Sequence, residues 1–125
     1  MDVDEAYALL GGAEFLDVRR DHEFAAGHVA GAVHIILQEV PLRYGELPGD
    51  RPVIVTCQVG QRSGLATEFL RARGIDAHNL EGGLKLWLSQ GFPLVSDGDG
   101  PGGVIDGRYE DLEVGSDPKG RPASG

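Results

Sequence analysis

Residues 52–63 read Pro-Val-Ile-Val-Thr-Cys-Gln-Val-Gly-Gln-Arg-Ser, and this stretch decides the fold class. Its β-branched run, 53–56, is typical of a parallel strand that is covered on both faces. A short loop with a glycine follows, and from Ser63 the apolar residues recur on one face of a helix. A buried strand, a loop and an amphipathic helix in this order indicate an α/β fold.

Short apolar runs and helical patterns alternate on both sides of this stretch. Helices are expected at 4–10, 21–26, 63–73 and 83–90, and further strands at 14–18, 33–36 and 75–80. The composition changes after residue 96, because the last 29 residues hold eight glycines, three prolines and few apolar side chains. Such a segment buries too little apolar surface to offset the entropy of ordering it. We therefore expect one domain over residues 1–96 and a flexible acidic tail over 97–125, of which residues 104–112 could dock on the domain or on a partner.

The net charge is −9, from 11 Lys and Arg against 20 Asp and Glu. Polyanions are repelled by such a surface, so nucleic acid and anionic membranes are disfavoured as partners. No apolar run is long enough to span a bilayer, and no basic segment followed by an apolar one marks the chain for export. We expect a cytoplasmic protein, and the sequence leaves open whether it is a monomer or a homodimer.

The chain has one cysteine, Cys57, which directly follows the buried strand and is the candidate nucleophile. A single cysteine makes neither an internal disulfide nor a cysteine-rich metal site. Ligands of α/β sheets bind beyond the carboxyl ends of the strands, where the loop after Cys57 lies. This loop supplies the candidate substrate-binding residues: Gln58, Val59, Gly60, Gln61, Arg62 and Ser63.

The chemistry of this loop suits an anion next to a thiol. Gly60 permits a tight turn, Ser63 is a natural helix N-cap, and Arg62 adds a cation that can orient an anionic substrate. A helix N-terminus and a cation favour thiolate over thiol, so no histidine base is needed. An inert buried cysteine is the structural alternative.

No catalytic or ligand-binding role is predicted for the other polar residues. The three histidines at 22, 28 and 34 have no metal-ligand spacing, and neither a metal nor a cofactor is expected. Four residues are expected to brace the fold: Asp17, Arg19, Glu23 and His28.

Several short motifs occur in order along the chain: Asp17-Val18-Arg19, Glu23-Phe24, the segment 27–35, the cysteine loop, Glu81-Gly82-Gly83, Trp87 and Gly91-Phe92-Pro93. Together they resemble a rhodanese domain, the fold of the thiosulfate sulfurtransferases, over residues 3–93. The resemblance implies an α/β three-layer fold with a central, mostly parallel, five-stranded sheet flanked by helices. The tail matches no motif of the family.

The resemblance also implies a two-step reaction. The Cys57 thiolate takes the sulfane sulfur of a small anionic donor such as thiosulfate, and a thiol, a protein cysteine or cyanide then accepts that sulfur. The six residues from Cys57 to Arg62 match sulfurtransferases, whereas the related phosphatases and arsenate reductases have a seven-residue loop. Arsenate reduction would also need a second cysteine.

A different class of function stays open beside the enzyme. The domain could be a non-catalytic sulfur carrier or interaction module. Residues 57–60 also resemble rhodanese domains fused to flavin-dependent disulfide or polysulfide reductases, so a flavoprotein of this kind is a candidate partner.

Overall fold

The structure is a computed structural model, and it describes residues 1–97 and 102–104. Its sheet has the strand order β2-β1-β3-β4, and every neighbouring pair is parallel. The strands are β1 (Glu14–Asp17), β2 (Val33–His34), β3 (Val53–Thr56) and β4 (Ala77–Asn79). The α/β fold with a parallel central sheet is confirmed.

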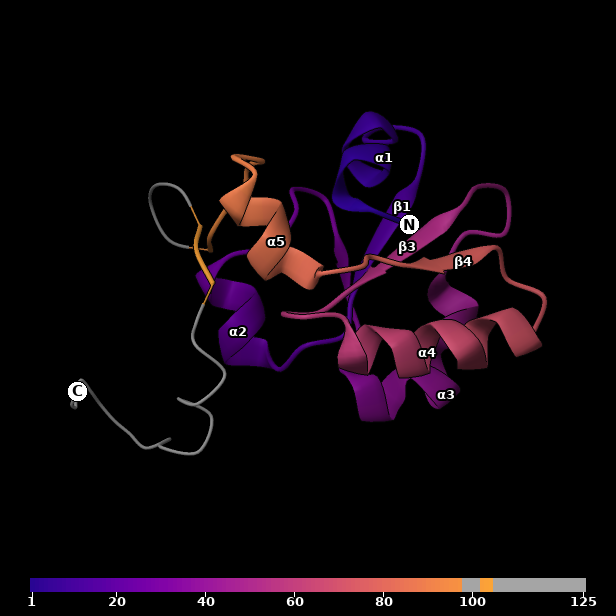
Figure 1. Cartoon of the computed structure of the whole chain (residues 1–125). Coiled ribbons are helices and arrows are strands. Elements are labelled where there is room, and N and C mark those ends of the chain that lie inside the picture. The colour runs from indigo at the N-terminus through magenta and orange to yellow at the C-terminus, as the bar shows by residue number, and fades with distance from the viewer. Residues whose placement is uncertain (98–101, 105–125) are drawn as a thin grey trace.

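Helices cover both faces of the sheet (Figure 1). One face carries α3 (Val40–Arg43) and α4 (Gln61–Ala72), and the other carries α1 (Val3–Ala8) and α5 (Gly83–Ser89). The short helix α2 (Asp21–Ala26) follows β1, and two 3₁₀ turns flank α3, η1 (Leu37–Glu39) and η2 (Tyr44–Glu46). The three-layer arrangement is therefore confirmed.

Alternate residues of the central strands feed two separate cores. Val53 and Val55 of β3 pack in the core under α4, whereas Ile54 packs in the core that contains Trp87 of α5. Successive side chains of a strand point to opposite faces, and all four residues of β3 are buried. The continuous β-branched run of β3 is thus explained by burial on both faces.

The expectation of five strands is wrong for the described residues, which form a four-stranded sheet. Met1 lies beside the end of β4, where its amino group donates to the carbonyl of Asn79 at 3.0 Å. The N–H of Glu81 donates to the Met1 carbonyl at 2.9 Å. This is the hydrogen-bond pattern of a parallel strand, but α1 begins at Val3, so the pairing does not extend into a strand.

The start of the predicted tail contacts the domain at the end of α2. The N–H groups of Asp97 and Gly103 donate to the carbonyls of Ala25 and Ala26 at 3.0 and 2.9 Å. Val104 packs against the core that contains Trp87. The rest of the predicted tail lies outside the described residues, and its flexibility stays a prediction.

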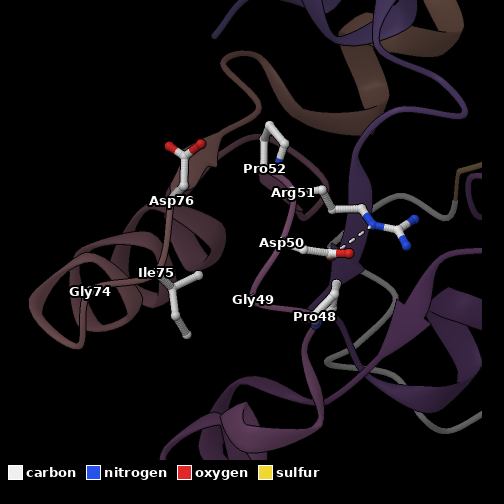
Figure 2. Close-up of a pocket in the computed structure, with 8 residues that line it drawn as sticks. All are labelled: Pro48, Gly49, Asp50, Arg51, Pro52, Gly74, Ile75 and Asp76. Carbon is white, nitrogen blue, oxygen red and sulfur yellow. Dashed lines mark hydrogen bonds and ion pairs between the residues drawn. The ribbon is translucent and has the colours of Figure 1, made fainter.

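A cavity of about 320 Å³ lies at the amino-terminal ends of β3 and β4, between residues 48–52 and 74–76 (Figure 2). The Asp50 and Arg51 side chains at its edge are 3.4 Å apart, and both are largely exposed. The cavity is at the opposite end of β3 from Cys57, so it is not part of the candidate site. Among the described helices, none has the length and apolar character needed to cross a bilayer.

Candidate active site

Cys57 leaves the carboxyl end of β3 with its side chain almost fully buried, at 1% exposure. The sulfur accepts hydrogen bonds from the N–H groups of Gly60, at 3.1 Å, and Ser63, at 3.3 Å. The Ser63 hydroxyl lies 3.2 Å from the same sulfur. The loop therefore closes back on Sγ, and two backbone dipoles point their positive ends at it.

The helix after the loop begins earlier than its sequence predicts. The N-cap is Gly60, with φ +101°, and α4 starts at Gln61, so the assignment of Ser63 as N-cap is wrong. Ser63 is the third residue of the helix, and its N–H has no acceptor within the helix. Since the Cys57 sulfur accepts that N–H, the cysteine itself caps α4.

A second helix N-terminus supports the loop from the other side. The N–H groups of Leu84 and Lys85 in α5 donate to the carbonyls of Cys57 and Gln58 at 2.8 and 3.0 Å. A Cβ on Gly83 would collide with the Gln58 carbonyl, and the backbone there has φ +67°. Glycine is thus needed at 83 for both space and conformation.

Arg62 is held by a buried carboxylate. Its two terminal nitrogens donate to the Glu23 oxygens at 2.7 and 2.9 Å, across 39 residues of sequence. Glu23 is fully buried, and the Arg62 side chain is 30% exposed. The Glu23 charge offsets the guanidinium charge, so much of the positive potential at the loop comes from N–H groups. Glu23, expected only to brace the fold, therefore sets the position of a candidate site residue.

A comparison of the sequence with models of protein families finds a match to the rhodanese-like domain over residues 2–90. The chain belongs to the rhodanese-like domain family. The resemblance inferred from the sequence motifs is confirmed.

Individual relatives of this rhodanese-like domain include sulfurtransferases. The thiosulfate sulfurtransferase GlpE of Stutzerimonas stutzeri is 35% identical over 86 residues, which are 67% of this chain and 79% of that protein. The uncharacterized protein YqhL of Bacillus subtilis is 42% identical over 76 residues, which are 60% of each chain. A crystal structure of a rhodanese-related protein from Thermoplasma volcanium superposes with a TM-score of 0.74 at 30% identity, covering 76% of this chain and 95% of that one.

The other predicted loop residues of the rhodanese-like domain differ in exposure. The Val59 side chain is half exposed and Gln61 is exposed, so both face the solvent side of the loop. The Gln58 side chain is buried, and its Oε1 has no hydrogen-bond partner among the described residues. The side chains of Val59 and Gln61 are therefore accessible from solvent, whereas that of Gln58 is not.

Sequence reasoning missed one residue of the site, Asn79 at the end of β4. Its Nδ2 donates to the Gly60 carbonyl at 3.1 Å, and its Oδ1 accepts the Ser63 hydroxyl at 2.5 Å. Its position at the carboxyl end of a parallel strand next to β3 was the signal that could have identified it.

The remaining polar residues of the rhodanese-like domain hold its elements together. Arg19 donates to both Asp17 oxygens, at 2.9 and 2.7 Å, and to the Gly27 carbonyl at 2.6 Å. This buried pair ties the end of β1 to the end of α2, as expected for a brace. Within residues 1–97 and 102–104, no three His, Cys, Asp or Glu side chains gather as metal ligands would.

Proposed function

We propose that this rhodanese-like domain is a sulfurtransferase that moves sulfane sulfur from thiosulfate or a persulfide donor to a thiophilic acceptor through a persulfide on Cys57. The observation that carries the proposal is the placement of the Cys57 sulfur at the N-terminus of α4, where the N–H groups of Gly60 and Ser63 donate to it. Backbone N–H groups at a helix N-terminus stabilise an anionic sulfur without a metal or an acid–base partner.

The proposed first step conserves atoms and charge. The Cys57 thiolate attacks the outer sulfur of thiosulfate, an S–S bond forms to Cys57, and the S–S bond to the sulfonate group breaks with release of sulfite. A persulfide of a thiol reacts in the same way and releases the thiolate. In the second step a thiolate acceptor, or cyanide, attacks the outer sulfur and regenerates the Cys57 thiolate.

The size of the loop supports sulfur transfer over oxyanion chemistry. Six residues lead from Cys57 to Arg62, and the loop is narrow enough for two of its N–H groups to reach the sulfur itself. We infer that the physiological reactants are a small anionic sulfur donor and a thiol or protein cysteine in the cytoplasm.

A non-catalytic sulfur carrier is the second candidate, and the pairing of Arg62 with Glu23 favours it. A cation whose charge is already offset attracts an anionic sulfur donor less than an unpaired one. Such a module would receive its sulfur from a partner protein, for which a flavin-dependent disulfide or polysulfide reductase is a candidate.

Intact-protein mass spectrometry after incubation with thiosulfate, or with a low-molecular-weight persulfide, tests the proposal. We expect a mass gain of one sulfur atom, its loss on addition of cyanide, and formation of thiocyanate. The Cys57→Ser variant should gain nothing. An adduct that forms only from a partner's persulfide would favour the carrier, and no adduct from any sulfur donor would refute both.

A further inference from the structure

Asn79 connects two groups that contact the nucleophilic sulfur, and its orientation follows from one of them. The Gly60 carbonyl can only accept a hydrogen bond, so the amide nitrogen of Asn79 must face it, at 3.1 Å. The carbonyl oxygen Oδ1 then faces the Ser63 hydroxyl at 2.5 Å. The Ser63 hydroxyl must therefore be the donor in that contact.

The group to which the Ser63 hydroxyl donates its proton determines whether the hydrogen bonds around Cys57 fit a thiol or a thiolate. A hydroxyl has a single proton, and Asn79 accepts it. Toward Cys57, at 3.2 Å, Ser63 Oγ can then offer only a lone pair, so the sulfur must be the donor there. The hydrogen bonds around the sulfur thus fit a thiol, which accepts two N–H groups and donates S–H to Ser63.

We propose that Asn79 is a positioning residue that orients the Ser63 hydroxyl as a hydrogen-bond acceptor for the Cys57 thiol. The hydroxyl can donate to the Cys57 thiolate only after its hydrogen bond to Asn79 breaks, so Asn79 opposes that rotation. When the thiol loses its proton to solvent, a lone pair of Ser63 faces a negative sulfur. The hydroxyl then rotates, breaks its bond to Asn79 and gives the sulfur a third donor. The inference rests on the proposed function, because the thiolate is the attacking species of the proposed reaction.

Charged groups on the surrounding elements stay the same in the test. They are Arg62 of α4 with Glu23 of α2, the Asp17–Arg19 pair at the end of β1, and Lys85 of α5. Differences in the pH dependence of variants at positions 63 and 79 therefore report two effects. One is the loss of hydrogen bonds between Asn79, the Ser63 hydroxyl and the Cys57 sulfur, and the other is any charge introduced at position 79.

The test is the pH dependence of Cys57 alkylation by iodoacetamide, in which no other thiol competes because the chain has one cysteine. Asn79→Leu removes the acceptor and frees the Ser63 hydroxyl for the thiolate. We expect the midpoint of its rate profile to fall by about one pH unit, a tenfold change in thiolate population at fixed pH below the midpoint. Asn79→Asp keeps an acceptor and adds a negative charge, so its midpoint should rise.

Both changes are repeated in a Ser63→Ala background, with circular dichroism as the check of folding. If Asn79 acts through the hydroxyl, the shift from Asn79→Leu should disappear there. Shifts of the same sign for the Leu and Asp variants, no shift for Leu, or a Leu shift that persists without the hydroxyl would overturn the inference.

If the Leu variant fails to fold, Asn79→Ala, which also removes the acceptor and adds no charge, takes its place. Its midpoint should fall in the wild-type background and stay unchanged in the Ser63→Ala background, and any other result refutes the role. Alkylation needs no sulfur donor, so this result is independent of whether Cys57 forms a persulfide.

Discussion

The ion pair between Arg62 and Glu23 predicts an asymmetric loss of stability when either partner is replaced. Glu23 is fully buried, whereas the Arg62 side chain is 30% exposed. Arg62→Ala removes two charged hydrogen bonds from a buried carboxylate, and breaking a buried pair in this way costs about 3–5 kcal/mol. Water can approach the exposed side of the pair, so we expect the lower end, about 3 kcal/mol.

The converse change should cost less. In Glu23→Gln the side chain keeps its shape and can still accept the Arg20 N–H, which lies 3.1 Å from Oε1. Arg62 can turn toward water, so the loss should be near that of a hydrogen bond to a charged group, about 1.5 kcal/mol. Adding Glu23→Gln to Arg62→Ala should recover part of the stability lost in Arg62→Ala alone.

Urea unfolding, followed by the fluorescence of the fully buried Trp87, measures these differences. A gap of about 1.5 kcal/mol corresponds to roughly 6–12 °C in Tm for a domain of this size. Arg43→Ala, which removes exposed pairs with Glu39 and Glu46, is the matched control and should unfold close to the wild type. If Glu23→Gln destabilises the domain as much as Arg62→Ala, the reasoning from burial is wrong.

Two further predictions concern the supports of the site. Gly83→Ala should displace the Gln58 carbonyl and slow Cys57 alkylation at least about tenfold, whereas Gly45→Ala, which meets no atom within 4 Å, should leave the rate unchanged. A chain ending at residue 97 should melt a few degrees below one ending at 104, as measured by calorimetry. The shorter chain lacks the packing of Val104 and the hydrogen bonds from the N–H groups of Gly102 and Gly103 to the carbonyls of Leu94 and Ala26. Equal melting temperatures would contradict the contact.

The sequence pattern was sufficient to predict the central strand β3, because burial on both faces requires a continuous run of apolar and β-branched residues. All four residues of β3 are buried, and its three apolar side chains pack in one or other of the two cores, as the uninterrupted β-branched run predicts. Residues 37–46 gave no such signal, because Pro41 and Gly45 interrupt the apolar pattern. The structure places Pro41 in the first turn of α3, where its missing N–H is not needed.

The sequence predicted only the part of the site that is contiguous along the chain. Cys57 and its loop are contiguous, so local chemistry identified the candidate nucleophile. The contacts that hold the loop span 39 residues from Glu23 to Arg62 and 16 from Ser63 to Asn79, and they depend on which strands are neighbours in the sheet. The start of α4 was misplaced because Ser63 is a good capping residue by type, while the acceptor that caps the helix is the Cys57 sulfur.

The capping role of the Cys57 sulfur connects the resting site to the proposed reaction. In the described part of the chain, the polar contacts of Sγ are two N–H groups and one hydroxyl, none of which titrates near neutral pH. A reaction whose leaving group must be protonated needs a general acid, whereas sulfur transfer moves an anionic charge from one sulfur to another. In the proposed persulfide the outer sulfur would lie about 2 Å from Sγ. The first turn of α4, which begins at Gln61, presents the positive end of its dipole at this loop and so favours the negative charge of that sulfur.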